Sequence, residues 1–177
     1  MRTNKHTTKS KRGLTPPTPG ESRPFPEDDI LQRSTYVPHY LMVVTNGLVW
    51  HSSRLYVKQL GIGLNECRIL TILADSGPLS AVQIAQILSI NKGAVSRALQ
   101  VLEEHGYIAA GAETYRRRVE LTAKSRPIHR QIVEIARARE ALLLKGFSAA
   151  EKTELLEYLS RMQDNIPLTR GYKPVSR

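Results

Sequence analysis

Apolar residues recur at helical spacing in two short neighbouring segments near the middle of the chain. In the first segment, positions i, i+3 and i+4 are held by Ile84, Ile87 and Leu88. In the second, positions i, i+3, i+4 and i+7 are held by Val95, Ala98, Leu99 and Leu102. Each segment is therefore predicted to form a helix whose single apolar stripe packs against the rest of the protein.

Polar residues at the ends of these segments predict where each helix begins. Ser80 is followed three residues later by Gln83, which is the spacing of a capping box. Asn91 is a favourable N-cap for the second helix. Only Ser89 and Ile90 remain between the helices, so the chain must turn sharply there. Two helices joined in this way form an αα corner or a helix-turn-helix.

The second helix carries small and basic residues on the side away from its apolar stripe, namely Lys92, Gly93, Ser96, Arg97 and Gln100. A solvated helix face usually carries Glu and Lys in i, i+4 pairs instead. Short hydrogen-bond donors beside a glycine permit the close approach of another surface. In DNA-reading proteins the N-terminal residues of such a helix meet base edges and phosphates. The alternative is the solvated face of an αα corner.

Two short strands are predicted directly after the second helix. Residues 107–110 form the first strand, and residues 117–121 form the second, where Val119 and Leu121 alternate with charged residues. The edge of this hairpin carries three arginines, Arg116, Arg117 and Arg118. A helix-turn-helix followed by a basic hairpin is a winged-helix arrangement, whose wing reaches the phosphate backbone or the minor groove. An edge strand protected by charge is the alternative, but together with the preceding helix the pattern favours DNA binding.

Further helices are predicted on both sides of this region. Residues 36–60 are apolar on more than one side, which predicts burial on two sides. Asn65 is predicted to cap the next helix, and a capping box at Ser148 and Glu151 opens the last helix of the chain. One chain offers too little surface to bury all these apolar faces. They therefore predict a helical homodimer, which a protein that reads a two-fold DNA site requires.

Length and charge narrow the classes of partner. The chain has 177 residues, a formal net charge of +10 and a pI near 10, which favours one folded domain with a polyanionic partner, nucleic acid first. A single cysteine excludes a disulfide framework within the chain. The longest apolar run, residues 41–44, is too short to span a bilayer. We expect a cytoplasmic protein that does not enter the membrane.

A shift in composition near residue 35 divides the chain. Residues 1–35 are rich in Pro, Ser and Thr and open with basic residues, which predicts a disordered arm that either solubilises the protein or adds phosphate contacts. Residues 36–166 are predicted to form the domain, with a winged helix-turn-helix at about 64–122 and dimerisation helices at about 36–60 and 123–166. Residues 167–177 are predicted to be a flexible tail.

The chain resembles the multiple-antibiotic-resistance regulator (MarR) family of winged-helix repressors over about residues 36–166. The resemblance is carried by GLNECRILTILADSGPLSAVQIAQILSINKGAVSRALQVLEEHGYI, then RRVELTAKSR, then IARAREALLLKGFSAAEKTELLEYLSRM. It implies a mainly α fold with a small β-hairpin wing, joined into a homodimer by its N- and C-terminal helices. It also implies a sequence-specific transcription regulator that binds a pseudo-palindromic operator in double-stranded DNA and is released by a small, often aromatic effector.

The predicted DNA-binding residues are Ser80, Asn91, Lys92, Gly93, Ser96, Arg97, Gln100, Arg116, Arg117 and Arg118. The wing is a few residues shorter than is usual in the family, and Glu113, Thr114 and Tyr115 occupy the place of an expected Asp-Arg pair. Either Arg116 or Arg117 is therefore expected to enter the minor groove. Pro127, within the first turns of the long helix that follows the wing, is expected to cause a local kink.

The predicted effector pocket includes Trp50, His51, Arg54 and Cys67. For Cys67 the sequence favours packing in the core, and for His51 an ordinary interface histidine is the alternative. Cys67 as a redox-sensing thiol is an alternative function, and a winged helix that binds a protein partner instead of DNA is another. No constellation of catalytic residues and no metal-ligand spacing stands out, so we expect no enzymatic activity, metal or cofactor.

Overall fold

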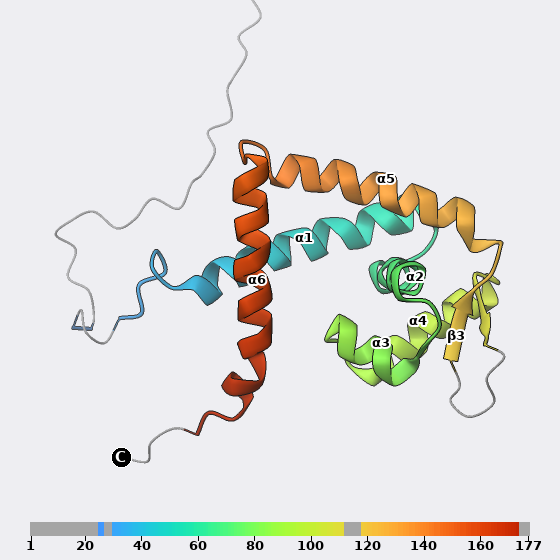
Figure 1. The fold of residues 1–177 in the computed structure, drawn as a ribbon, viewed down its shortest axis with the longest axis horizontal. Coiled ribbons are helices and arrows are strands. Elements are labelled where there is room, and N and C mark those ends of the chain that lie inside the picture. The colour runs from blue at the N-terminus through green and yellow to red at the C-terminus, as the bar shows by residue number, and fades with distance from the viewer. Residues whose placement is uncertain (1–24, 27–29, 112–117, 174–177) are drawn as a thin grey trace, which may run out of the picture. The chain divides into compact units, whose positions relative to one another are not determined.

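The computed structural model describes residues 25–26, 30–111 and 118–173 of the chain. The chain divides into two units, Met1–Gly47 and Leu48–Arg177. The boundary falls within α1 (Val37–Leu60), and the other elements belong to the second unit (Figure 1). These are α2 (Leu64–Ser76), β1 (Leu79–Ser80), α3 (Ala81–Leu88), α4 (Lys92–Glu104), β2 (Ile108–Ala110), β3 (Arg118–Leu121), α5 (Ser125–Leu143) and α6 (Ala149–Arg170).

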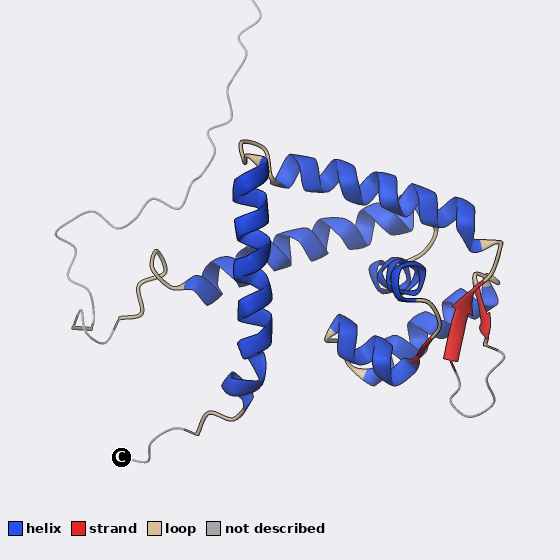
Figure 2. Ribbon diagram, viewed as in Figure 1, coloured by secondary structure: helices blue, strands red, loops and turns tan. Residues whose placement is uncertain are grey.

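The predicted fold class is confirmed, because helices dominate the described residues and the strands form one small antiparallel sheet (Figure 2). The core lies in the second unit and is centred on α2. Its wholly buried side chains include Ile69, Leu70, Ile84, Val95 and Leu102. They come from α2, α3 and α4, so the two helices of the predicted helix-turn-helix share one core with α2.

The helix-turn-helix of α3 and α4 forms as predicted. The Ser80 Oγ accepts a hydrogen bond from the Gln83 N–H, and the Gln83 Oε1 accepts one from the Ser80 N–H at 2.9 Å. Asn91 caps α4, since its Oδ1 accepts from the Ala94 N–H at 2.8 Å. Ser89 adopts the left-handed conformation, with φ 52°, between the helices. Both predicted caps are confirmed, and the corner is as tight as the sequence requires.

The sheet is larger than predicted, because it has three strands in the order β1-β3-β2. Val119 in β3 is aligned with Leu79 on one side and with Ala110 on the other. The sequence predicts the two strands of the hairpin but misses β1, since a strand of two residues shows no period. β1 runs directly into α3, and the sheet therefore joins the base of the wing to the helix-turn-helix.

The start of α2 and the inward face of α3 differ from prediction. The N-cap of α2 is Gly63, and the predicted cap Asn65 lies in the first turn. A Cβ at Gly63 would stand 2.5 Å from the Glu66 Oε2, so glycine leaves room for this carboxylate near the positive end of the helix. Ile87, predicted to face the core, is 49% exposed, because α3 buries only one narrow stripe along its eight residues.

The last two helices extend the second unit. Pro127 does not interrupt α5, because it is the third residue of the helix and a first-turn N–H has no intrahelical acceptor to lose. α6 passes through Pro167 and ends at Arg170, beyond the residue at which the flexible tail was expected to begin. No residue of α6 is buried. Its apolar side chains are therefore at most partly covered within the described part of the chain.

The cap of α4 leads to a first prediction. Replacing Asn91 by Ala is expected to lower the free energy of unfolding by about 1 kcal/mol, since an N-cap side chain satisfies an otherwise unpaired backbone N–H. Asn65→Ala is the matched control, and we expect a change of less than about 0.5 kcal/mol because this residue caps no helix. Urea denaturation at fixed protein concentration measures both. Equal losses for the two variants would contradict the assigned caps.

Candidate nucleic-acid interface

One face of α4 separates cleanly from the core. Val95, Ala98 and Leu102 are buried, whereas the predicted DNA-binding residues of this segment are all exposed. These exposed residues are Asn91, Lys92, Gly93, Ser96, Arg97 and Gln100. The helix has no acidic residue in its first turn. Its N-terminal half therefore combines exposed donors, basic side chains and the positive end of the helix dipole.

The first turn of α4 is open to close approach. A Cβ built at Gly93 would lie 3.4 Å from the Asn91 Oδ1 and 3.6 Å from the Arg97 Nη1, and these are the nearest groups. The Arg97 guanidinium thus lies beside the N-terminus of the helix rather than beside its middle. Because both contacts are close to ordinary van der Waals distance, the chain itself does not require glycine here. A surface that approaches α4 closely would require it.

The C-terminal half of α4 is different in charge. The Gln100 Nε2 donates a hydrogen bond to the Glu104 Oε1 at 3.0 Å, and the neighbouring Glu103 is also exposed. A phosphate near this end would meet carboxylates. The helical period predicts Gln100 on the same exposed face as Arg97. The sequence prediction misses its hydrogen bond to Glu104, although the i, i+4 spacing of the two residues is typical of such a pair. The exposed donors and basic side chains of α4 therefore lie mainly in its N-terminal half, before Gln100.

The base of the wing lies beside α3. Arg118 is half-buried in β3 and aligned with Ser80, whose hydroxyl also donates a hydrogen bond to the Gln83 Oε1 at 2.9 Å. Arg116 and Arg117, the other predicted wing contacts, lie outside the described residues. Of the predicted arginines, Arg118 is thus the one that the structure places, and it stands at the root of the wing.

The segment that carries this geometry is similar to known proteins. Residues 60–118, from the end of α1 to the first residue of β3, match the model of the MarR family. The crystal structure of a MarR/EmrR family transcriptional regulator from Acinetobacter sp. ADP1 is 28% identical, with a TM-score of 0.72, covering 78% of this chain and 99% of that chain. Over residues 60–118 the chain thus matches the MarR family model, and its fold is similar to that of MarR family transcriptional regulators.

Two further MarR structures are similar. A MarR family transcriptional regulator from Silicibacter pomeroyi is 26% identical, with a TM-score of 0.68, and the match covers 76% of this chain and 92% of that chain. A putative MarR family transcriptional regulator from Listeria monocytogenes, complexed with 26mer DNA, is 21% identical, with a TM-score of 0.69, covering 80% of this chain and 99% of that chain. At that identity the likeness to the Listeria protein shows the shared fold.

A cavity of about 310 Å³ lies where four helices of the second unit meet. α1 contributes Tyr56, α5 contributes Ile132 and Ala136, and α2 and α3 contribute most of the remaining lining. Apart from the Tyr56 hydroxyl and the Cys67 thiol, its polar side chains are those of Arg68 and Thr71. The cavity is therefore largely apolar, with one cationic group at its wall.

Cys67 lines this cavity but is poorly suited to redox sensing. Its side chain is 2% exposed, and burial together with the neighbouring Glu66 carboxylate raises the pKa of the thiol to about 12. The thiolate is the reactive form of cysteine. At neutral pH the side chain is therefore a buried, protonated thiol that packs in the core.

The environment of Cys67 leads to a second prediction. Cys67 in the folded protein is expected to resist alkylation by iodoacetamide at pH 8, because at a pKa near 12 about one thiol in ten thousand is ionised. Mass spectrometry measures the modified fraction over time. The same protein in urea, where the thiol regains its ordinary pKa, is the control and should react fully. Rapid modification without urea would contradict the buried, protonated state.

The other predicted pocket residues do not line this cavity. Trp50 is 63% exposed, and the Arg54 guanidinium lies 4.8 Å from the centre of its ring. His51 is also exposed on the same helix. The structure thus brings Trp50 and Arg54 together on α1 and places Cys67 apart from them, in the core.

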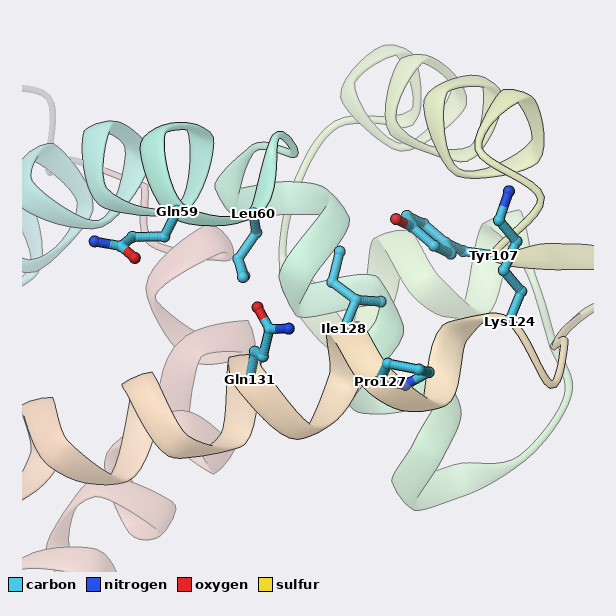
Figure 3. Close-up of a pocket in the computed structure, with 7 residues that line it drawn as sticks. All are labelled: Gln59, Leu60, Tyr107, Lys124, Pro127, Ile128 and Gln131. Atoms are coloured by element: carbon cyan, nitrogen blue, oxygen red, sulfur yellow. The ribbon is translucent and has the colours of Figure 1, made fainter.

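A second pocket, of about 300 Å³, adjoins the start of β2 (Figure 3). α1 contributes Gln59 and Leu60 to it, and α5 contributes Pro127, Ile128 and Gln131. The Lys124 Nζ lies 5.8 Å from the centre of the Tyr107 ring, and His105, directly after α4, stacks on the same ring with centroids 5.5 Å apart. This stack links the end of α4 to the start of α5.

Within residues 25–26, 30–111 and 118–173, no group of His, Cys, Asp and Glu side chains is arranged to hold a metal ion. None of the helices in the described part of the chain is long and apolar enough to cross a membrane.

Proposed function

We propose that this protein is a sequence-specific transcription regulator that binds double-stranded DNA with α4 in the major groove. The observation that carries the proposal is the exposed face of α4, which places small and basic donors at the N-terminus of a helix set at a tight corner. The match of residues 60–118 to the MarR family model and the likeness to a MarR/EmrR family transcriptional regulator support it. The operator is defined as the DNA sequence that the protein selects from a random pool.

The proposed contacts with DNA are of two kinds, those to base edges and those to the phosphate backbone. Lys92, Gly93, Ser96 and Arg97 meet base edges, where each good bidentate contact contributes roughly 1–3 kcal/mol of discrimination. Gln100 also contacts a base edge after its hydrogen bond to Glu104 breaks. Ser80 and Asn91 stand at helix starts and approach phosphates. The wing arginines, Arg116, Arg117 and Arg118, hold the DNA backbone or the minor groove.

The protein is proposed to act as a homodimer. Helix α6 buries none of its residues, and Leu156, Tyr158 and Leu159 are each more than a third exposed. In the first unit, most of the apolar residues of α1 are exposed as well, among them Tyr40 and Met42. Exposed apolar surface of this extent marks an interface, and a two-fold operator supplies the matching symmetry.

The regulator is proposed to be a cytoplasmic repressor that a small effector releases from DNA. The cavity at Cys67 supports an effector site, because it is lined by α2 and α3 on one side and by α1 and α5 on the other. Its largely apolar lining with one arginine suits a small, mostly apolar molecule. Trp50, His51 and Arg54 do not line this cavity, so a role for them in binding the effector is a separate proposal for the exposed face of α1.

A third prediction tests the division of labour between helix and wing. Replacing Arg97 by Ala should relax sequence preference at one or two base pairs while leaving binding to scrambled DNA nearly unchanged. Replacing Arg117 by Ala should weaken binding to both DNAs and reduce the slope of log affinity against log salt by about one. Fluorescence anisotropy titrations at several salt concentrations measure both effects. If both variants lower the affinity for every sequence equally, helix and wing do not have separate roles.

Two other functions have less support. A protein-binding winged helix would favour exposed aromatic or large apolar residues on α4, and none of the exposed residues between Asn91 and Gln100 is of that kind. A redox-sensing repressor would need Cys67 as a thiolate, against its burial and raised pKa. If peroxide releases the wild type from its operator but not Cys67→Ser, the redox function replaces the effector proposed above.

A further inference from the structure

Arg68 in α2 connects this helix to the turn between α3 and α4, which we call the corner. Its side chain crosses to the next helix, and its Nη2 donates a hydrogen bond to the backbone carbonyl of Leu88 at 3.0 Å. Leu88 is the last residue of α3 and is buried. On its other side Arg68 lines the cavity that it shares with Cys67 and Ile132. One side chain thus contacts both the end of α3, which is the first helix of the helix-turn-helix, and the wall of the cavity.

The Leu88 carbonyl is not followed by a further helical turn whose N–H groups could bond to it, because α3 ends at this residue. The left-handed Ser89 turns the chain, the Ile90 N–H bonds back to the Ala85 carbonyl at 3.2 Å, and Asn91 already caps α4. Few residues therefore remain to fix the angle between the two helices. A charged donor on the Leu88 carbonyl is a stronger restraint than a neutral one, and it ties this corner to α2.

We propose that Arg68 is a positioning residue that sets how α4 meets the bases, although it makes no contact with DNA itself. The inference rests on the proposed function. Contacts to base edges depend on the orientation of the recognition helix, since bidentate hydrogen bonds tolerate little displacement. Contacts to phosphates are made by flexible side chains and depend mainly on charge. Loss of the Arg68 hydrogen bond therefore weakens operator binding more than it weakens binding to scrambled DNA.

The test compares Arg68→Met, which keeps a long side chain but removes the donor, with Arg130→Met. Arg130 is an exposed arginine in α5, so this control removes the same charge without touching the corner. We expect Arg68→Met to lose about tenfold in operator affinity beyond any loss shown by the control. Its affinity for scrambled DNA should match that of the control. Arg68→Lys, which keeps a charged donor, should recover most of the loss.

The stability of the corner between α3 and α4 can also be measured without DNA. By hydrogen exchange, the Ile90 amide should exchange faster in Arg68→Met than in the control, because this amide bonds across the corner. If Arg68→Met is unfolded at the assay temperature, Arg68→Gln replaces it in both assays with the same expectation. Equal losses on operator and scrambled DNA, or unchanged exchange at Ile90, would overturn the role of Arg68. If the wild type itself does not prefer any DNA sequence, the proposed function fails instead.

Discussion

Replacing Ser96 by Glu is expected to lower the affinity for the operator by at least about a hundredfold. Ser96 lies on the exposed face of α4, one turn after Lys92 and Gly93. The change removes a small donor whose contact is worth roughly 1–3 kcal/mol and brings a carboxylate against phosphates and base acceptors. A factor of a hundred corresponds to about 2.8 kcal/mol. Titration of labelled operator at near-physiological salt measures the loss.

The control for Ser96→Glu carries the same added charge on another helix. Gln131→Glu changes an exposed residue of α5. We expect this control to weaken binding by no more than severalfold, through the change in net charge. Both variants should keep the unfolding temperature of the wild type, since both side chains are exposed. Comparable losses in the two variants would mean that α4 is not the surface that reads DNA.

Replacing Leu156 by Glu is expected to raise the dissociation constant of the dimer by about thirtyfold to several hundredfold. Leu156 is 56% exposed in α6, a helix with no buried residue. A carboxylate desolvated in an apolar interface costs on the order of the 2–4 kcal/mol of an interface hot spot. Sedimentation velocity at micromolar concentration should show a shift toward monomer. Because two half-sites are bound together, operator affinity should fall with the dimer.

The matched control on the same helix is Asn165→Glu. Asn165 is exposed and lies nine residues after Leu156, which places it on the opposite side of α6 at 100° per residue. The control should stay dimeric and keep its operator affinity. If Leu156→Glu sediments as the wild type does, α6 does not form the interface, and its apolar face needs another partner.

Local signals explain what the sequence predicts correctly. The caps at Ser80, Asn91 and Ser148 are confirmed, because each is a hydrogen bond between residues three positions apart. The burial of Val95 and Ala98 against the exposure of Ser96 and Arg97 follows from the helical period alone. The exposed face of α4 can therefore be predicted from the residues of this helix by themselves.

What the sequence misses depends on distant residues. β1 is two residues long and exists because Leu79 and Val119 pair across about forty positions. Asn65 is a good cap by type, yet the helix begins one residue earlier, at Leu64, with Gly63 as its N-cap and the Glu66 side chain beside it. The hydrogen bond from Arg68 to Leu88 and the enclosure of Cys67 likewise need the packing of several helices. Such contacts leave no period in the sequence.

The most direct test of the central claim is to select bound fragments from random double-stranded DNA with the purified wild-type protein at near-physiological salt. The account predicts a pseudo-palindrome whose half-sites lie about one helical turn apart, because two copies of α4 in a two-fold dimer enter successive major grooves on one side of the duplex. Fragments with no common sequence, whose binding disappears with modest added salt, would instead show charge-driven contact without readout. That result would contradict α4 as a recognition helix.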